Sequence, residues 1–108
     1  MEEILAKANE LGLLIKDTDA FARFEELNNE VENNREASLL LKKYNEIAET
    51  IQQKQSAGFT LEKFEQERFR EISGAVASNE LLLKYLKVRE EYIELLMSIH
   101  KSLISEDL

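Results

Sequence analysis

The sequence predicts an all-α fold, with about five helices in an antiparallel bundle, a long C-terminal helix and a dimeric assembly. Two observations support this fold class. The 108 residues contain no proline and only three glycines, so the turn residues that β-hairpins need are scarce. Residues that favour helices dominate, and apolar residues recur at helical spacing. A chain of this length forms one domain, residues 1–108, that buries about two-thirds of its surface.

Two helices are expected in the first third of the chain. The first covers residues 2–15 and carries a helical stripe of Ile4, Ala8, Leu11 and Ile15. Asp17 or Thr18 then caps a second helix over residues 19–32. This second helix has a narrow stripe of Phe21, Phe24, Leu27 and Val31. A narrow stripe predicts burial on one side only, and the acidic remainder is a solvated face or steers a basic partner.

Two further helices are expected in the middle of the chain. Asn33, with Glu36 three residues later, matches a reciprocal capping pattern that opens a helix reaching about Ala57. Gly58 ends that helix, because glycine adopts the left-handed conformation without steric cost. Thr60 then caps a fourth helix, which ends in the small residues 73–78. Its apolar positions are Leu61, Phe64, Phe69, Ile72 and Val76.

The longest predicted helix covers residues 79–105, about 40 Å at 1.5 Å per residue, and Ser78 or Asn79 caps it. Residues 81–104 include 14 apolar residues, whereas one buried stripe needs about 10. The excess predicts that a second copy of the chain covers part of this helix. The candidate interface consists of Tyr85, Val88, Tyr92, Leu95, Leu96, Ile99 and Leu103. Alternatively, the helix of residues 2–15 covers the extra apolar face. A second question is left open: the first two helices pack on their own subunit, or they are exchanged across the dimer.

A few polar residues lie on the apolar faces of the predicted helices and form a candidate buried polar network: Gln55, Glu65, Arg68, Arg89 and His100. If helices four and five form an antiparallel hairpin about Ser78, Glu65 bridges Arg68 and Arg89. By the same counting, Gln55 reaches His100. The network then fixes helix register, or it lies in a groove and receives the charges of a partner.

Charge and composition exclude several classes of function. The net charge is −8, which is unfavourable for direct binding to nucleic acid or to an anionic membrane. The chain has no cysteine, so it forms no disulfide and holds no thiolate-bound cluster of its own. No apolar run approaches the length of a membrane span, and the Met-Glu-Glu start lacks the basic region of a signal peptide. We therefore expect a cytoplasmic protein without a cofactor.

Catalytic groups are also missing from the sequence pattern. The pairs Glu67/Glu71 and Glu90/Glu94 each place two carboxylates on one helix face, but the chain has one histidine and lacks the Glu-x-x-His motifs of di-iron bundles. The glutamate pairs are therefore interpreted as solvated surface rather than as a metal site. No phosphate-binding loop and no nucleophile with a neighbouring base is present. The sequence indicates a non-enzymatic protein.

The order of several segments resembles that of the YlbF/YmcA family of small bacterial helical proteins. The segments that carry the resemblance are Ala8–Ile15, Ile51-x-x-x-Gln55-x-x-Gly58, Val76-x-x-Asn79, Tyr85-Leu86 and Tyr92–Ile99. The resemblance implies a helical fold that commonly dimerises and has no catalytic activity. It also implies a role in regulatory complexes that affect competence and biofilm formation and that assist ribonuclease Y in processing RNA. The iron–sulfur clusters of such complexes are held by cysteines.

The sequence departs from that pattern at its end, Ser105-Glu106-Asp107-Leu108, which carries no cysteine. The cluster-binding function is therefore assigned to no residue, and the chain resembles the cysteine-free, YheA-like branch. The leading hypothesis is an adaptor that forms a homodimer and binds a protein of a regulatory or RNA-processing complex. The alternative is a holdase-type chaperone whose apolar stripes clasp unfolded chains.

Overall fold

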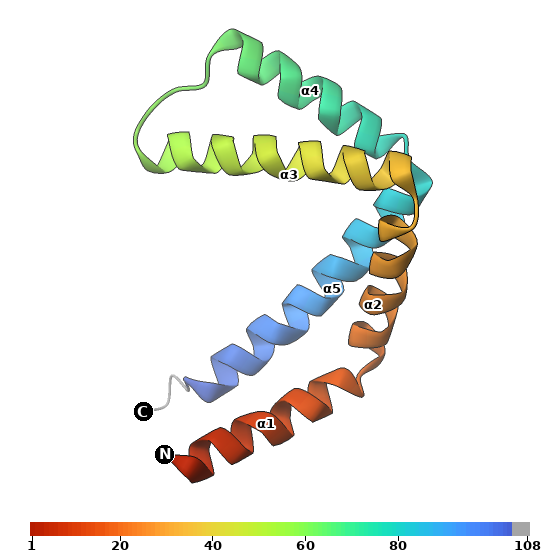
Figure 1. Ribbon diagram of the computed structural model, residues 1–108. Helices are drawn as coiled ribbons and strands as arrows, with labels where there is room; N and C mark the ends of the chain where they lie inside the picture. The colour runs from red at the N-terminus through yellow and green to blue at the C-terminus, as the bar shows by residue number, and fades with distance from the viewer. Residues whose placement is uncertain (105–108) are drawn as a thin grey trace. The chain divides into compact units, whose positions relative to one another are not determined.

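The computed structural model describes residues 1–104, and this part of the chain contains five α-helices (Figure 1). They are α1 (Glu2–Lys16), α2 (Asp19–Glu32), α3 (Arg35–Ser56), α4 (Lys63–Ala77) and α5 (Glu80–Leu103). The all-α prediction is confirmed. The predicted end of the last helix at Ser105 lies outside the described residues, as do the other residues of the cysteine-free C-terminal segment.

The helices belong to two compact units that interleave along the chain. One unit combines residues 1–28 with the segment from Tyr85 onward, and the other consists of residues 29–84. Both α2 and α5 therefore contribute to each unit. A single domain over residues 1–108 stays a prediction.

Local capping interactions fix where α2 and α5 begin. The backbone N–H of Phe21 donates to Oγ1 of Thr18 at 3.2 Å, so Thr18 rather than Asp17 caps α2. The N–H of Leu82 donates to Oδ1 of Asn79 at 3.0 Å, and this makes Asn79 the cap of α5. Each cap satisfies a backbone donor that has no partner within its helix.

The structure corrects the predicted starts of α3 and α4. Asn34, not Asn33, caps α3: its backbone is extended, and its Oδ1 accepts from the N–H of Ala37 at 2.9 Å. For α4 the capping residue is Glu62 rather than Thr60. The Glu65 carboxylate accepts from the N–H of Glu62 at 3.0 Å, which anchors the first turn two residues later than Thr60 would place it.

The end of α3 at Ser56 confirms the predicted glycine stop. Gly58 has φ +82°, in the left-handed region that other residues avoid. The N–H of Gly58 donates to the carbonyl of Gln55, and the N–H of Phe59 donates to the carbonyl of Lys54 at 2.9 Å. These two bonds form a Schellman motif, which closes the helix and turns the chain toward α4.

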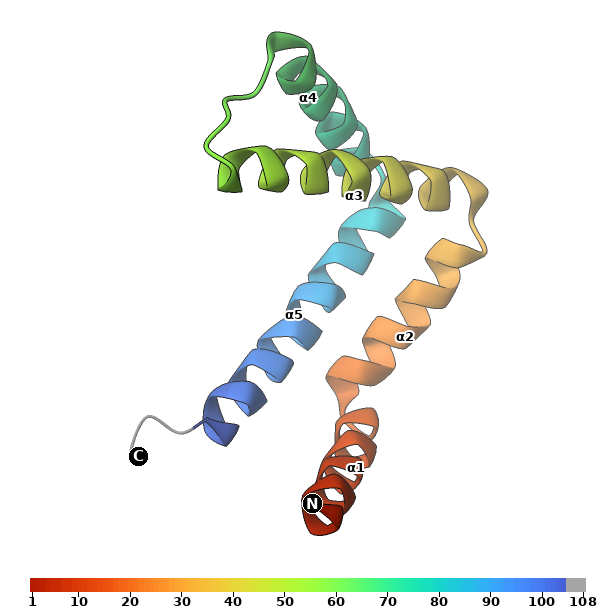
Figure 2. The same cartoon turned by 60° about the vertical axis from the view of Figure 1, so that its left-hand side comes forward.

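In the unit of residues 29–84, α3 and α4 pack side by side and run in opposite directions (Figures 1 and 2). The Tyr44 and Phe69 rings stack between them, with centroids 6.3 Å apart. The buried apolar side chains of this unit are Val31, Ala37, Ile47, Ile72, Val76 and Leu82. Ala37 and Ile47 belong to α3, and Ile72 and Val76 belong to α4, so apolar packing between these two helices holds the hairpin together.

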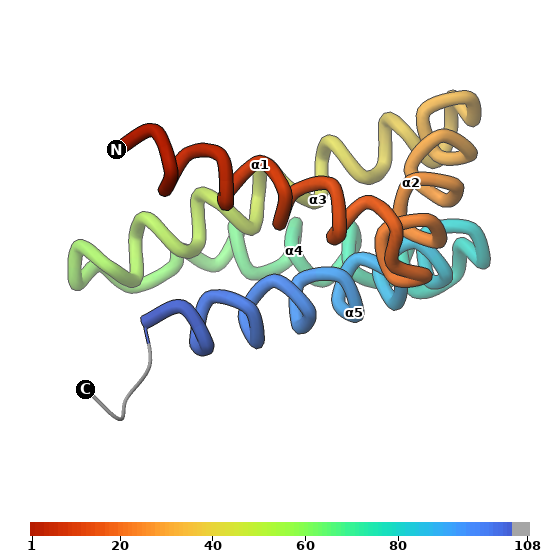
Figure 3. Tube along the Cα trace, turned by 90° about the horizontal axis from the view of Figure 1, so that it is seen from below, coloured from red at the N-terminus to blue at the C-terminus, as the bar shows by residue number. Residues whose placement is uncertain are grey.

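In the other unit, whose helices are labelled in Figure 3, the first part of α2 packs against α5, and α1 shares a groove with Leu103 at the end of α5. No residue of α1 is buried. The helix has formed, but its apolar stripe is only partly covered: Leu11 and Ile15 are half-buried, whereas Ile4 and Ala8 are exposed.

Candidate interaction surface

The apolar arc of α5 divides into two halves with different environments. One half contacts α2 of the same chain through Tyr85 and Tyr92. The Phe24 ring stacks on Tyr92, with centroids 5.1 Å apart and 16° between the ring planes, and lies 5.8 Å from Tyr85. Phe21 meets Tyr92 edge-on at 5.7 Å. An ion pair between Arg23 and Glu91, at 3.2 Å, flanks this aromatic cluster. The cluster covers the side of α5 that carries Tyr85 and Tyr92.

This packing corrects part of the predicted dimer interface. Tyr85 is 6% exposed, so its ring is covered within the chain, whereas Tyr92 is half-buried against Phe21 and Phe24 and its place in the interface stays a prediction. The physical reason is that α2, whose narrow stripe faces one side, covers this half of α5. The remaining candidate residues differ in exposure. Val88, Leu95, Leu96 and Ile99 are half-buried, and Leu103 is 67% exposed.

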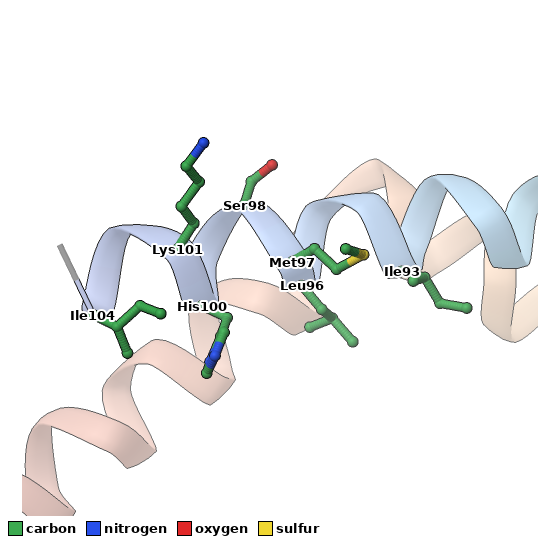
Figure 4. Close-up of a pocket in the computed structure, with 7 residues that line it drawn as sticks. All are labelled: Ile93, Leu96, Met97, Ser98, His100, Lys101 and Ile104. Atoms are coloured by element: carbon green, nitrogen blue, oxygen red, sulfur yellow. The ribbon is translucent and has the colours of Figure 1, made fainter. Parts of the chain in front are cut away.

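The other half of the α5 arc is exposed and was not singled out in the sequence. Ile93 is 44% exposed, Met97 65% and Ile104 58%. Together with His100 they line a shallow groove of about 550 Å³ (Figure 4). In the figure, Leu96, His100 and Ile104 project on one side of the ribbon, whereas Ser98 and Lys101 project on the other. A helical wheel places these residues within the apolar arc of α5. It does not show which half of the arc α2 covers.

A second apolar groove, of about 660 Å³, lies between α1 and the end of α5. Its lining residues are Glu3, Ile4, Ala6, Lys7, Ala8, Leu11 and Leu103. Leu5, Leu13 and Leu14 of α1 are also exposed. Met97 and Ile104 stay exposed, so α1 does not cover this part of α5, contrary to the alternative considered from the sequence. Contiguous exposed apolar surface is a common feature of interaction sites.

One residue of the predicted buried polar network, Glu65, pairs with a residue outside that network. Glu65 is buried, and its Oε1 accepts a hydrogen bond from Nζ of Lys54 at 2.5 Å. This hydrogen bond, together with that from the Glu62 N–H, lowers the pKa of Glu65 despite the opposing effect of burial. Lys54 was not among the predicted network residues. It reaches Glu65 because the α3–α4 turn brings the last turn of α3 beside the first turn of α4.

The other members of the predicted network have separate environments. Gln55, Arg68 and His100 are exposed, so the prediction that they are buried is wrong. Arg89 is half-buried, and its guanidinium carbon lies 5.7 Å from the centroid of the Tyr85 ring, a cation–π contact. Glu65 and Arg89 belong to different units. The bridge between them stays a prediction.

Two absences characterise residues 1–104. Within this range no group of three or more His, Cys, Asp or Glu side chains is arranged to hold a metal ion. Over the same residues, no helix combines the length and the hydropathy that crossing a membrane requires.

Comparison with known proteins places the chain in a family. A family model described as control of competence regulator ComK, YlbF/YmcA, matches residues 4–107. A UPF0342 protein of Lactobacillus acidophilus is 26% identical over 102 residues, which cover 94% of this chain and 88% of that protein. A UPF0342 protein of Lactobacillus helveticus is 28% identical over 102 residues, which again cover 94% of this chain and 88% of that protein. The chain therefore belongs to the YlbF/YmcA family, which is associated with control of the competence regulator ComK, and this membership confirms the resemblance found in the sequence.

Proposed function

We propose that this protein is a non-enzymatic regulatory adaptor that acts in the cytoplasm, as a homodimer, through contacts with other proteins. The observation that supports the proposal most strongly is the exposed apolar surface of α5 and α1 in a member of a family associated with control of ComK. Monomeric proteins seldom leave contiguous apolar surface of this size in water. An adaptor needs such a surface, whereas an enzyme needs a set of reactive groups.

The partner class follows from charge and family. The net charge of −8 favours contact with proteins over direct contact with RNA or with an anionic membrane. We therefore place any role in competence, biofilm formation or ribonuclease Y-dependent RNA processing in a protein complex. This role requires no cofactor, and the cysteine-free sequence provides no thiolate ligand for an iron–sulfur cluster.

Affinity capture from the native cell tests the adaptor role. The tagged full chain is compared with Met97→Glu, which places a charge on the exposed face, and with Leu39→Glu, a matched change at an exposed leucine of α3. We expect the wild type and L39E to recover the same proteins repeatedly and M97E to lose them. Failure of the wild type to recover any protein above a tag-only control would contradict the adaptor role.

A holdase-type chaperone is the second candidate, and the exposed apolar grooves of α1 and α5 favour it. This function predicts that the protein suppresses aggregation of a heat-denatured client at stoichiometric amounts, and that M97E is less effective. Normal client aggregation in the presence of excess wild-type protein would exclude this function.

A further inference from the structure

We propose that the exposed face of α5 pairs with the same face of a second copy, in an antiparallel arrangement about a twofold axis between Ser98 and Ile99. This inference rests on the homodimer in the proposed function, and it specifies the interface. The residues that carry it are the groove residues Ile93, Met97, His100 and Ile104. They lie on the half of α5 that α2 leaves exposed.

The spacing of these four residues is palindromic. Successive positions are four, three and four residues apart, from Ile93 to Ile104, so the row reads the same in both chain directions. This alternation of three and four is the seam of a coiled coil. The N–H of Ile104 donates to the carbonyl of His100 at 3.1 Å, so the helical turn continues to the end of the seam.

A twofold axis between Ser98 and Ile99 brings the seam residues into register. Ile93 meets Ile104 of the second copy, and Met97 meets His100 of the second copy. The seam runs from Ile93 to Ile104, a rise of about 16 Å at roughly 1.5 Å per residue. In a twofold interface the same surface of both copies is used, and each contact occurs twice. A row of residues that matches its own reversed order can therefore pair with the same row of a second copy.

The residues that flank the seam are complementary to themselves in the same register. In an antiparallel pair each edge of the seam faces the equivalent edge of its partner. One edge carries Glu94 and Lys101, so each carboxylate faces an ammonium group of the second copy. The other edge carries Leu96 and Leu103, which face each other. A parallel pairing would instead set the edge of Glu94 and Lys101 against the edge of Leu96 and Leu103, where these charges meet leucines rather than opposite charges.

Apolar surface of α1 adjoins the end of the seam. Ile93, Met97, Leu103 and Ile104 of α5 are 44–67% exposed, and Ile4 of α1 is 67% exposed. Ile4 and Leu103 line one groove, so a second copy that covers the seam also reaches this part of α1, toward the roughly 800 Å² per partner of a standard interface. The α5 seam sets the orientation, and α1 extends the interface.

Cysteine cross-linking of the full chain tests the orientation, because the natural sequence has no cysteine. Glu94→Cys and Lys101→Cys are prepared as separate single variants. After mild oxidation, an equimolar mixture is expected to give a covalent dimer, whereas each variant alone stays monomeric on a denaturing gel. Cross-linking of either variant alone, with no further dimer in the mixture, would overturn the antiparallel register.

Light scattering separates failure of this interface from failure of the homodimer. The wild type is expected at twice the chain mass of 12.5 kDa. Met97→Glu is expected to raise the dimer dissociation constant at least tenfold, whereas Leu39→Glu leaves it unchanged. Lys101→Glu is expected to weaken the dimer several-fold, and the double variant E94K/K101E restores it because the charges again alternate.

Each remaining outcome has a definite meaning. A wild-type mass of one chain at micromolar concentration contradicts both the homodimer and the seam. A dimer that neither M97E nor K101E weakens keeps the homodimer but assigns it to another face, such as α1, and overturns the seam.

Discussion

Glu65 shows how a residue on an apolar helix face acquires its partner. Its place on the wheel of α4 marked it as a buried charge, and the structure confirms that it is buried. The partner is Lys54, which lies across the α3–α4 turn, and not Arg68 on its own helix. Lys54 itself is half-buried, so its long side chain packs along the hairpin while its ammonium group meets the carboxylate.

The lowered pKa of Glu65 predicts a pH-dependent contribution to stability. Because the folded-state pKa lies below the ordinary value of 4.5, the contribution is complete above that value and is lost as the pH falls below it. Glu65→Gln removes the charge and should lower the urea midpoint at pH 7. The difference between wild type and E65Q should shrink as the pH falls from 5 to 3.

Glu67→Gln is the matched control, since Glu67 is exposed on the same helix. It should leave the midpoint at pH 7 nearly unchanged. An E65Q defect that stays constant from pH 7 to pH 3 would contradict the role of the ionised carboxylate.

Asn34 provides a second prediction at the residue scale. Asn34→Ala removes the acceptor for the Ala37 N–H and should lower the free energy of unfolding by about 1 kcal/mol, the usual value of such a cap. Asn33→Ala, the adjacent control, should change it by less than about 0.5 kcal/mol, as for an ordinary surface position. Urea unfolding monitored by circular dichroism measures both. Equal losses would show that Asn34 does not act as the cap.

Among the elements, α5 shows how one helix serves two neighbours. Its apolar arc is wider than a single contact requires, and α2 covers the half that contains Tyr85 and Tyr92. The exposed half keeps the palindromic seam. The total width of the arc was visible in the sequence, but the division between an internal and an external half depended on where α2 packs.

Phe24 is the main contact of α2 with α5, and its replacement gives a prediction for this element. Phe24→Ala removes the ring that stacks on Tyr92 and lies beside Tyr85. Because Phe24 is half-buried, we expect a loss of about 2 kcal/mol, below the range for fully buried phenylalanines. The near-ultraviolet circular dichroism of the tyrosines should also weaken.

Phe64→Ala is the matched control, because Phe64 is exposed in α4. It should cost less than about 0.5 kcal/mol and leave the tyrosine signal intact. A larger effect of F64A than of F24A would contradict the assignment of Phe24 as the anchor of α2.

On the scale of the whole molecule, association and folding are expected to be coupled. The two units share α2 and α5, and α1 has no buried residue, so covering α5 and α1 by a second copy adds apolar burial that a single chain lacks. The thermal midpoint should therefore rise with chain concentration. A hundredfold increase stabilises a fully linked dimer by up to about 2.7 kcal/mol.

Scanning calorimetry or circular dichroism measures the thermal midpoint over a hundredfold range of chain concentration, starting from the lowest usable concentration. Met97→Glu should abolish the concentration dependence, and Leu39→Glu should retain it. A midpoint of the wild type that is independent of concentration would show that folding does not depend on association.

The sequence by itself determined the helices, the glycine stop at Gly58, the excess of apolar residues on the last helix and the family, because these depend on local propensity and on periodic spacing. Which residues cap α3 and α4 depended on which side chain accepts a hydrogen bond from the backbone N–H groups at the start of each helix. Only the tertiary structure decided that Lys54 pairs with Glu65 and that α2 covers the Tyr85 half of α5. The physical reason is that a helical wheel fixes the direction of each side chain around its own axis, whereas the partner in that direction is set by how the helices pack.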